Sequence, residues 1–218
     1  MTEGTARMDW ARDARTGLPE AVYAEGKTVA QLIAILSEAA AQDRPLLLTR
    51  LATSRLADLP PDLRANLDHD ALSQTAIFGT PPQPAAAGVT VVCAGLADMP
   101  VVGEAVRTLA FSGVRAQVVT DVGVAGLWRL LERLDELRAA RIIIAVAGME
   151  GALFSVLAGL VSAPIIAVPT SVGHGVATGG HVALNSALAS CAPGLVTVNI
   201  DNGFGAAQSA LRILHAGR

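Results

Sequence analysis

Residues 28–41 have the apolar spacing of an amphipathic helix. Thr28, followed by Gln31 three residues later, forms a capping box that marks the helix start. The apolar positions then recur every three or four residues; they are Val29, Leu32, Ile33, Leu36 and Ala40. The pattern predicts a helix over 28–41, and the apolar run Leu46–Thr49 predicts a short strand after it.

The C-terminal part of the chain alternates short apolar runs with helix-length segments. The runs show no polar alternation, which indicates strands covered on both faces. The predicted strands span residues 89–94, 116–120, 142–147, 165–168 and 195–200. The predicted helices span residues 99–112, 124–138, 151–161, 176–191 and 204–216. Five successive βα units predict an α/β fold, a flavodoxin-like doubly wound parallel sheet between two helical layers.

A change of composition near residue 80 divides the chain into two domains. Residues 1–79 are charged and mixed, and we expect a small N-terminal α+β domain. Within it, Pro60-Pro61 and Asp68-His69-Asp70 are typical of surface loops. Residues 80–88 are rich in Pro and Ala and predict a linker. Residues 89–218 then form the α/β domain.

Charge excludes several classes of function. The chain has 16 Lys+Arg against 19 Asp+Glu, a net charge of −3, whereas a general nucleic-acid binder needs a basic surface. Lys27 is the only lysine, which excludes a P-loop or a Schiff-base lysine from the rest of the chain. We therefore expect no nucleic-acid partner.

Residues 151–200 carry no Asp, Glu, Lys or Arg, yet they do not predict a membrane span. Glycine, proline and serine interrupt the stretch too often for the roughly 20 apolar residues that a span needs. Buried strands and helices explain the composition instead. Without an apolar signal segment at the N-terminus, and with only Cys93 and Cys191 as cysteines, we expect a cytoplasmic protein.

Ligands of open α/β sheets bind beyond the carboxyl ends of the strands. All five loops that leave the predicted strands contain glycine, and four contain a carboxylate, which favours a small anionic ligand. Each glycine alone is also explained by turn geometry, and Asp98 and Asp121 equally well by helix N-capping. The candidate binding residues are Gly95, Asp98, Asp121, Gly123, Gly126, Gly148, Met149, Gly151, Thr170, Ser171, Gly173, Asn199, Asp201, Asn202 and Gly203.

Glu150 is the only charged residue between Arg141 and Asp201. Burying an ionised carboxylate without partners costs several kcal/mol, so we expect Glu150 to reach a polar cavity or to have a raised pKa. Both outcomes suit a group that transfers protons. Cys191 ends the predicted helix 176–191, where a small buried apolar residue is the simplest interpretation. It lies at the opposite end of the sheet from the loops, so it could reach their site only on another subunit.

Several runs resemble the LarB family of nickel-pincer-nucleotide biosynthesis carboxylase/hydrolases. They are Asp121–Leu127, Val146–Leu153, Ala167–Gly173 and Val198–Gly205, with Thr16–Glu20 and Tyr23–Thr28 in the first domain. The resemblance covers nearly the whole chain. The C-terminal domain is more distantly similar to PurE, the aminoimidazole ribonucleotide carboxylase or mutase.

The resemblance implies carboxylation of the pyridinium ring of nicotinic acid adenine dinucleotide at C5, with hydrolysis of the phosphoanhydride to release AMP. The product would be pyridinium-3,5-biscarboxylic acid mononucleotide, used to make the nickel-pincer cofactor. The family's catalytic cysteine falls on Cys191 and its catalytic glutamate on Glu150. The resemblance further implies CO2 or bicarbonate as a substrate, Mg²⁺ as a cofactor with unassigned ligands, and a homo-octamer with sites at its interfaces.

The sequence departs from the family pattern at four positions and leaves the nucleotide open. Leu96 and Ala97 replace two hydroxyl residues, Phe154 replaces proline, and His174 replaces tyrosine. PurE-type chemistry is the first alternative, although residues 121–124 lack the His-Arg-Thr-Pro element of PurE and residues 148–154 lack its histidine. The second is a paralogue that acts on, or only senses, another nucleotide.

Overall fold

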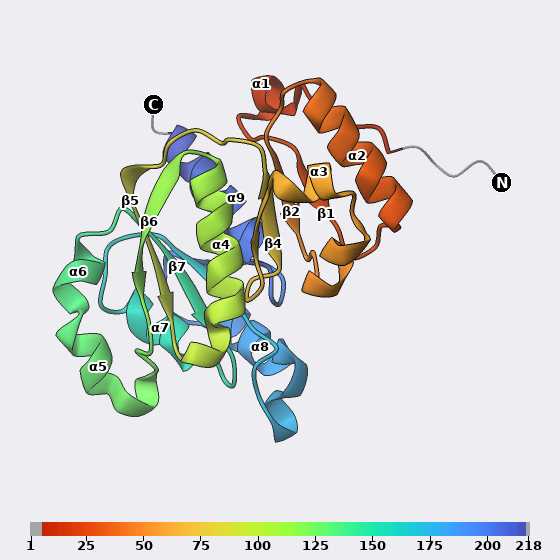
Figure 1. Ribbon diagram of the computed structural model, residues 1–218. Helices are drawn as coiled ribbons and strands as arrows, with labels where there is room; N and C mark the ends of the chain where they lie inside the picture. Colours follow the sequence, from red (N-terminus) through yellow and green to blue (C-terminus); the bar gives the residue numbers. More distant parts are fainter. Residues whose placement is uncertain (1–5, 217–218) are drawn as a thin grey trace.

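The N-terminal part of the computed structural model, which describes residues 6–216, folds around a four-stranded mixed sheet (Figure 1). Strand β1 (Ala21–Tyr23) runs parallel to β2 (Leu46–Thr49), and β4 (Thr75–Phe78) pairs antiparallel with both β2 and β3 (Leu67–Asp70). Helices α1 (Arg12–Thr16), α2 (Val29–Ala41) and α3 (Pro61–Ala65) and a 3₁₀ turn over Thr53–Asp58 complete this part. The expected small α+β domain is confirmed.

The capping box of α2 forms as predicted, and the helix packs one face on the sheet. Thr28 Oγ1 accepts from the Gln31 backbone N–H at 3.2 Å, and Gln31 Oε1 accepts from the Thr28 N–H at 2.9 Å. Two predicted loops are wrong. Pro61 is the first residue of α3, a position where proline costs no hydrogen bond. The run Leu67–Asp70 is an edge strand, where polar residues are tolerated because one side has no neighbour.

The second sheet has five parallel strands in the order β6-β5-β7-β8-β9, which confirms the predicted flavodoxin-like topology. The strands are β5 (Ala85–Cys93), β6 (Val114–Val119), β7 (Ile142–Ala147), β8 (Ile165–Pro169) and β9 (Leu195–Thr197). Every residue of β7 and β8 is buried, as expected for strands covered on both faces.

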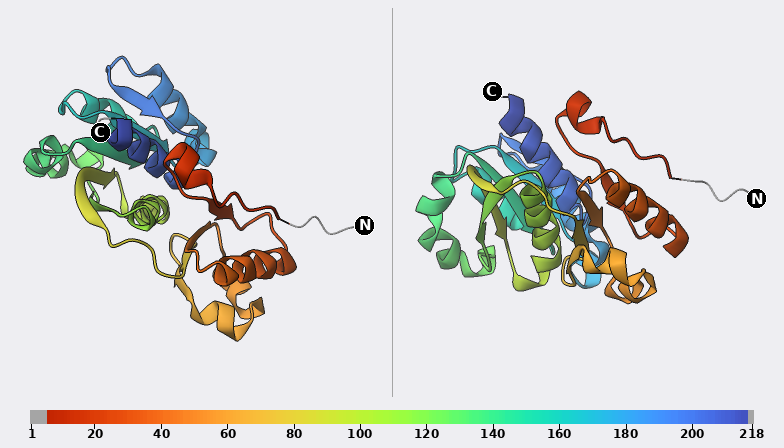
Figure 2. Two further views of the ribbon diagram at one scale, coloured as in Figure 1. Left: turned by 90° about the horizontal axis from the view of Figure 1, so that it is seen from above. Right: turned by 45° about the horizontal axis from the view of Figure 1, so that its top comes forward.

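Helices cover both faces of the parallel sheet (Figure 2). Helices α4 (Met99–Phe111) and α9 (Gly203–Ala216) pack on one face in a shared apolar core with β5, β7 and β8. Helices α5 (Leu127–Glu132), α6 (Leu134–Arg138), α7 (Ala152–Ala158) and α8 (His181–Ala189) pack on the other. None of the helices in residues 6–216 is long and apolar enough to cross a membrane.

Several predicted elements differ from the structure; the predicted strand 195–200 ends at Thr197 in β9, and the predicted helix 151–161 ends at Ala158 in α7. Strand β5 begins at Ala85, inside the predicted linker 80–88, because its first residues pair with β6 before a bulge. The predicted helix 124–138 is a 3₁₀ turn followed by α5 and α6, which break at Arg133. The predicted helix 176–191 begins as 3₁₀ and breaks at Gly179 and Gly180, both with a φ of +79°, so α8 starts only at His181.

The two parts of the chain contact each other along α4. Leu47 of β2, Ile77 of β4 and Phe111 of α4 form a small buried apolar cluster, against which Phe204 of α9 also packs. Arg107 of α4 donates to the carbonyl oxygen of Asp68 at 2.6 Å. These contacts place the end of β2 beside the loops that leave the parallel sheet. The predicted domain limits include residues 1–5 and 217–218, which lie outside the described residues.

Candidate functional site

A cavity of about 300 Å³ lies at the carboxyl ends of β5, β6 and β7, and we call it the strand-end pocket. Seven predicted binding or catalytic residues line it: Gly95, Asp98, Gly123, Gly148, Met149, Glu150 and Gly151. The remaining wall is almost entirely apolar and includes Ala97, Val124, Leu153 and Val172. The loops after the first three strands therefore converge on one cavity.

Two glycines of this pocket differ in what a side chain would meet. A Cβ on Gly148 would lie 2.0 Å from the carbonyl oxygen of Val172, because the loops after β7 and β8 contact each other through their backbones. Gly148 is thus required by packing. Gly95 is extended, with a φ of −144°, and a Cβ there would meet no atom within 4 Å. Neither packing nor backbone conformation requires a glycine at position 95, so a side chain there would extend into open space.

Asp98 is a buried wall of the pocket rather than a cap of α4. Its carboxylate accepts from Thr170 Oγ1 at 2.7 Å and from the Gly95 N–H at 3.0 Å, and makes no capping bond to α4. The residue is only 3% exposed. Burial raises the pKa of the Asp98 carboxyl, although these two hydrogen bonds oppose the shift; the Asp201 carboxylate adds to the rise. Asp98 occupies the N-cap position of α4, but its carboxylate does not cap that helix.

Asp121 lies in the loop after β6 without lining the strand-end pocket. Its backbone is left-handed, with a φ of +57°, and its carboxylate accepts from Arg129 Nη1 at 2.6 Å. The cap of α5 is Gly126, so the N-cap interpretation fails for Asp121 as well. Thr170 and Gly173, in the loop after β8, do not line the pocket either. Thr170 is fully buried and donates to Asp98, and a Cβ on Gly173 would lie 2.5 Å from the carbonyl oxygen of Ala177.

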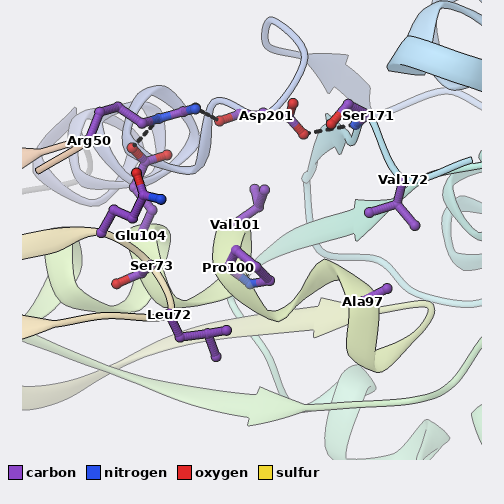
Figure 3. A pocket seen from close by; sticks show the side chains of 11 residues that line it. Arg50, Leu72, Ser73, Ala97, Pro100, Val101, Glu104, Ser171, Val172 and Asp201 are labelled. Atoms are coloured by element: carbon purple, nitrogen blue, oxygen red, sulfur yellow. Dashed lines mark hydrogen bonds and ion pairs between the residues drawn. The ribbon is translucent and has the colours of Figure 1, made fainter. Parts of the chain in front are cut away.

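A second cavity, of about 220 Å³, lies between the two parts of the chain, and we call it the interdomain pocket (Figure 3). The predicted binding residues Ser171 and Asp201 line it, and Asp201 Oδ1 accepts from the Ser171 N–H at 2.8 Å. Asn199 and Asn202 line an adjoining cavity of about 340 Å³ with Asp201. Gly203 lines neither; a Cβ there would lie 2.4 Å from the carbonyl oxygen of Val101.

An ion pair that sequence analysis missed crosses between the domains. Arg50 follows β2, and its Nε lies 3.4 Å from Glu104 Oε1 on α4, while Nη2 donates to the carbonyl oxygen of Asp201. Glu104 is 4% exposed. Burial raises the pKa of the Glu104 carboxyl, and Arg50 and the Phe204 N–H oppose the shift. The pair ties the N-terminal domain to the loop after β9.

Glu150 and Cys191 are both exposed. Glu150 lines the strand-end pocket, so it reaches a cavity as expected, but the rest of that cavity's wall is almost entirely apolar and not polar. Cys191 is not the buried residue that its apolar surroundings indicated; it lies beyond the end of α8. An open groove of about 650 Å³ between α7 and α8 runs from Glu150 to Ala189, two residues before Cys191. We call it the helical groove. The two residues lie at opposite ends of the sheet, as the topology predicted.

The other cysteine, Cys93, is buried. Cys93 ends β5 beside the strand-end pocket, but its side chain is fully buried in the core. Burial raises the pKa of the Cys93 thiol, which disfavours the reactive thiolate. Of the two thiols, the exposed one at Cys191 is the better placed to react.

The implied Mg²⁺ has no preformed cage of side chains in residues 6–216, where no group of three or more His, Cys, Asp or Glu could hold a metal ion. Mg²⁺ usually binds through one or two carboxylates together with substrate phosphates and water. The residues present fit only that kind of site, with the phosphates supplying most of the contacts.

Comparisons with known proteins agree with this architecture. A family model described as the LarB/PurE-like N-terminal domain matches residues 2–79, and the AIR carboxylase model matches residues 88–218. A protein of Methanocaldococcus jannaschii, named Uncharacterized protein MJ0165, is 36% identical over 226 residues, which cover 98% of this chain and 86% of that protein.

Two solved structures share the fold of the C-terminal part. A single-substitution variant of Treponema denticola PurE2 has a TM-score of 0.50 at 20% identity, and the match covers 64% of this chain and 83% of the variant. Treponema denticola PurE has the same TM-score and identity, with 60% and 81% covered. At 20% identity, these two structures show a shared fold and nothing about function.

Proposed function

Because the chain belongs to the LarB-like family with an AIR carboxylase (PurE-like) domain, we propose that it carboxylates C5 of the pyridinium ring of nicotinic acid adenine dinucleotide. In the same proposal it hydrolyses the phosphoanhydride with water, giving AMP and pyridinium-3,5-biscarboxylic acid mononucleotide. The observation that carries the proposal is the strand-end pocket itself. It offers apolar walls for a flat ring and one exposed carboxylate, Glu150, at its mouth.

Cys191 supplies the nucleophile in this mechanism. A pyridinium ring is too electron-poor to attack CO2. Addition of the Cys191 thiolate forms a C–S bond and turns the ring into an enamine, whose C5 attacks the CO2 carbon. The exposed thiol of Cys191 is open to such a ring, whereas the buried Cys93 thiol is not.

Glu150 then acts as the base. After the new C–C bond forms, C5 still carries its hydrogen, and the Glu150 carboxylate removes it as a proton. The electrons return to the ring, the C–S bond breaks, and the thiolate leaves with its electron pair, which restores the aromatic ring. The net change is replacement of the C5 hydrogen by a carboxylate, with one proton released. Mg²⁺ would enter with the substrate phosphates, and none of these steps depends on it.

A single chain cannot complete this site, so the proposal includes a homo-oligomer, expected to be an octamer. Helix α8 spans nine residues, about 13 Å at 1.5 Å per residue, and it separates Cys191 from the strand-end loops. The surface beside Cys191 is apolar and uncharged: Leu188 is 67% exposed and Val196 56% exposed. A second copy packed there would cover this surface and bring its Glu150 toward Cys191.

Mass spectrometry tests the function. The purified chain is incubated with nicotinic acid adenine dinucleotide, ¹³C-bicarbonate and Mg²⁺, and the expected product has gained ¹³CO2 and lost AMP. Cys191→Ala and Glu150→Gln should both fail to form it, whereas Cys93→Ala, the matched thiol control, should form it. No labelled product in the wild type would overturn the proposal.

The same assay separates the alternatives. Carboxylation of aminoimidazole ribonucleotide in place of the dinucleotide would indicate PurE-type chemistry. Dinucleotide binding without any product would indicate a sensing paralogue. In either case Leu96 and Ala97, in the altered first loop, are the residues to examine.

A further inference from the structure

The interdomain pocket adjoins the strand-end pocket, since Ala97 and Val172 line both. A dinucleotide has two nucleosides joined through two phosphates, so its second nucleoside needs a cavity that adjoins the strand-end pocket. We infer that the interdomain pocket binds the AMP half of the substrate, so that the N-terminal domain forms part of the site. This inference rests on the proposed function, which supplies the ring half for the strand-end pocket.

Arg50 offers free donors to a phosphate at this pocket. Its guanidinium carries five N–H groups in a planar fork. Nε faces Glu104 and Nη2 donates to the Asp201 carbonyl oxygen, but no hydrogen bond within residues 6–216 uses Nη1. Nη1 is also not buried, so it can meet a ligand. Glu104 acts here as a positioning residue, because it holds one edge of the guanidinium and leaves the other edge open (Figure 3).

The other polar groups suit a ribose. Asp201 Oδ1 is occupied by the Ser171 N–H, whereas Oδ2 has no hydrogen bond within the described chain. A carboxylate oxygen accepts hydrogen bonds from hydroxyl groups. The Ser171 hydroxyl lies in the same wall of the pocket. These groups face the cavity from the loops after β8 and β9.

An apolar wall suits the base. Leu72, Pro100, Val101 and Val172 supply the apolar lining of the pocket. Leu72 is 56% exposed, although leucine is among the residues most often buried. A flat purine packed on Leu72 would bury this surface.

Backbone conformation marks the same cavity. Six non-glycine residues among the described ones have a positive φ, and three of them line this pocket: Arg50 at +56°, Gln74 at +52° and Asp201 at +55°. Conformations of this kind are costly and cluster at ligand clamps and active sites. Their gathering from three separate loops indicates a built site rather than an accidental gap.

The number of open donors bears on the kind of phosphate. Arg50 is the only cation that lines the interdomain pocket, and two of its three guanidinium nitrogens already face Glu104 and the Asp201 carbonyl oxygen. The remaining nitrogen, Nη1, suits contact with one phosphate better than with a polyphosphate.

Calorimetric titration with AMP tests the inference on the full chain. Wild type should bind AMP, and Arg50→Gln should weaken the binding about tenfold to a hundredfold, the range expected for a lost hydrogen bond to a charged group. The matched control is Arg64→Gln, an exposed arginine of the same domain that does not line the pocket. It should bind AMP as wild type does. Binding of nicotinic acid mononucleotide should be unchanged in both variants.

A second variant guards against a folding defect. Arg50→Gln leaves Glu104 buried without its cation, whereas Arg50→Gln with Glu104→Gln leaves a neutral pair, so the double variant should fold normally and still bind AMP weakly. AMP affinity equal to wild type in both variants would overturn the inference. So would carboxylation of the dinucleotide by a wild-type chain that does not bind AMP, an outcome that leaves the function intact. Arg50-dependent AMP binding without carboxylation would instead overturn the function and keep the pocket.

Discussion

The carboxyl end of the parallel sheet collects cavities and buried polar groups, whereas the amino end presents an exposed thiol on an apolar surface. At the carboxyl end, Asp98 and Glu104 are buried, and both main pockets open there. At the amino end, Cys191 follows α8 close to the exposed Leu188. Each end holds half of the proposed chemistry. In the proposed mechanism, the reaction needs the carboxyl end of one chain and the amino end of another.

The strongest test of this division is complementation between chains. Cys191→Ala and Glu150→Gln should each lower turnover by at least about a hundredfold, since each removes a reacting group. Mixed assemblies refolded or co-expressed from the two variants should regain activity, because about a quarter of randomly formed interfaces pair an intact Cys191 with an intact Glu150. Steady-state rates of the purified mixture measure this. A mixture as inactive as its components would place both residues in one chain.

The next effect concerns assembly. Leu188→Asp should break the contact that covers the amino end, so that light scattering detects the 22.3 kDa chain in place of a larger assembly, with activity lost. Ile213→Asp on α9, an exposed apolar residue over the opposite face, is the control and should keep the assembly. A fully active monomer of either the wild type or Leu188→Asp would contradict the shared site.

Two glycines at the carboxyl end should respond differently to alanine. Gly148→Ala forces a methyl group against the Val172 carbonyl oxygen and should lower the free energy of unfolding by about 1–3 kcal/mol. Gly95→Ala has open space and should change it by less than about 0.5 kcal/mol, while weakening substrate binding. Denaturant unfolding and a binding titration measure both. Normal binding by Gly95→Ala would remove the loop after β5 from the site.

The smallest effect is a pH dependence. Burial raises the pKa of Asp98 in the folded chain above its value in the unfolded chain, so the folded form holds the proton more tightly. The free energy of unfolding therefore falls as pH rises from the unfolded pKa through the folded one. Asp98→Asn should remove this part of the slope, seen as a difference between the two stability curves. Parallel curves would show that the carboxyl is not buried in solution.

Sequence patterns predicted the strand order because each strand is a separate apolar run and five βα units allow few topologies. They missed Arg50 because its partner comes from a distant helix. One sign was present: Val101, Glu104, Ala105 and Thr108 recur at helical spacing, which puts the glutamate on the buried face of the predicted helix 99–112. A buried carboxylate needs a cation or hydrogen-bond donors, but only the tertiary arrangement identifies which groups supply them.

The exposure of Cys191 and Glu150 could not be predicted from the sequence, because composition does not show what covers an apolar surface. An uncharged stretch indicates burial, and burial in an assembly leaves the same composition as burial in a core. The helix break at Gly179 and Gly180, by contrast, could be predicted from the sequence, since two adjacent glycines destabilise a helix.

The cluster of Leu47, Ile77 and Phe111 makes the boundary near residue 80 a poor place at which to truncate the protein. The two family models meet there, so separate expression of residues 88–218 is the obvious simplification. Such a fragment would expose Phe111 to solvent and leave the Glu104 carboxylate without Arg50. The truncated product would be expected to aggregate, and its inactivity would say nothing about the chemistry of the intact chain.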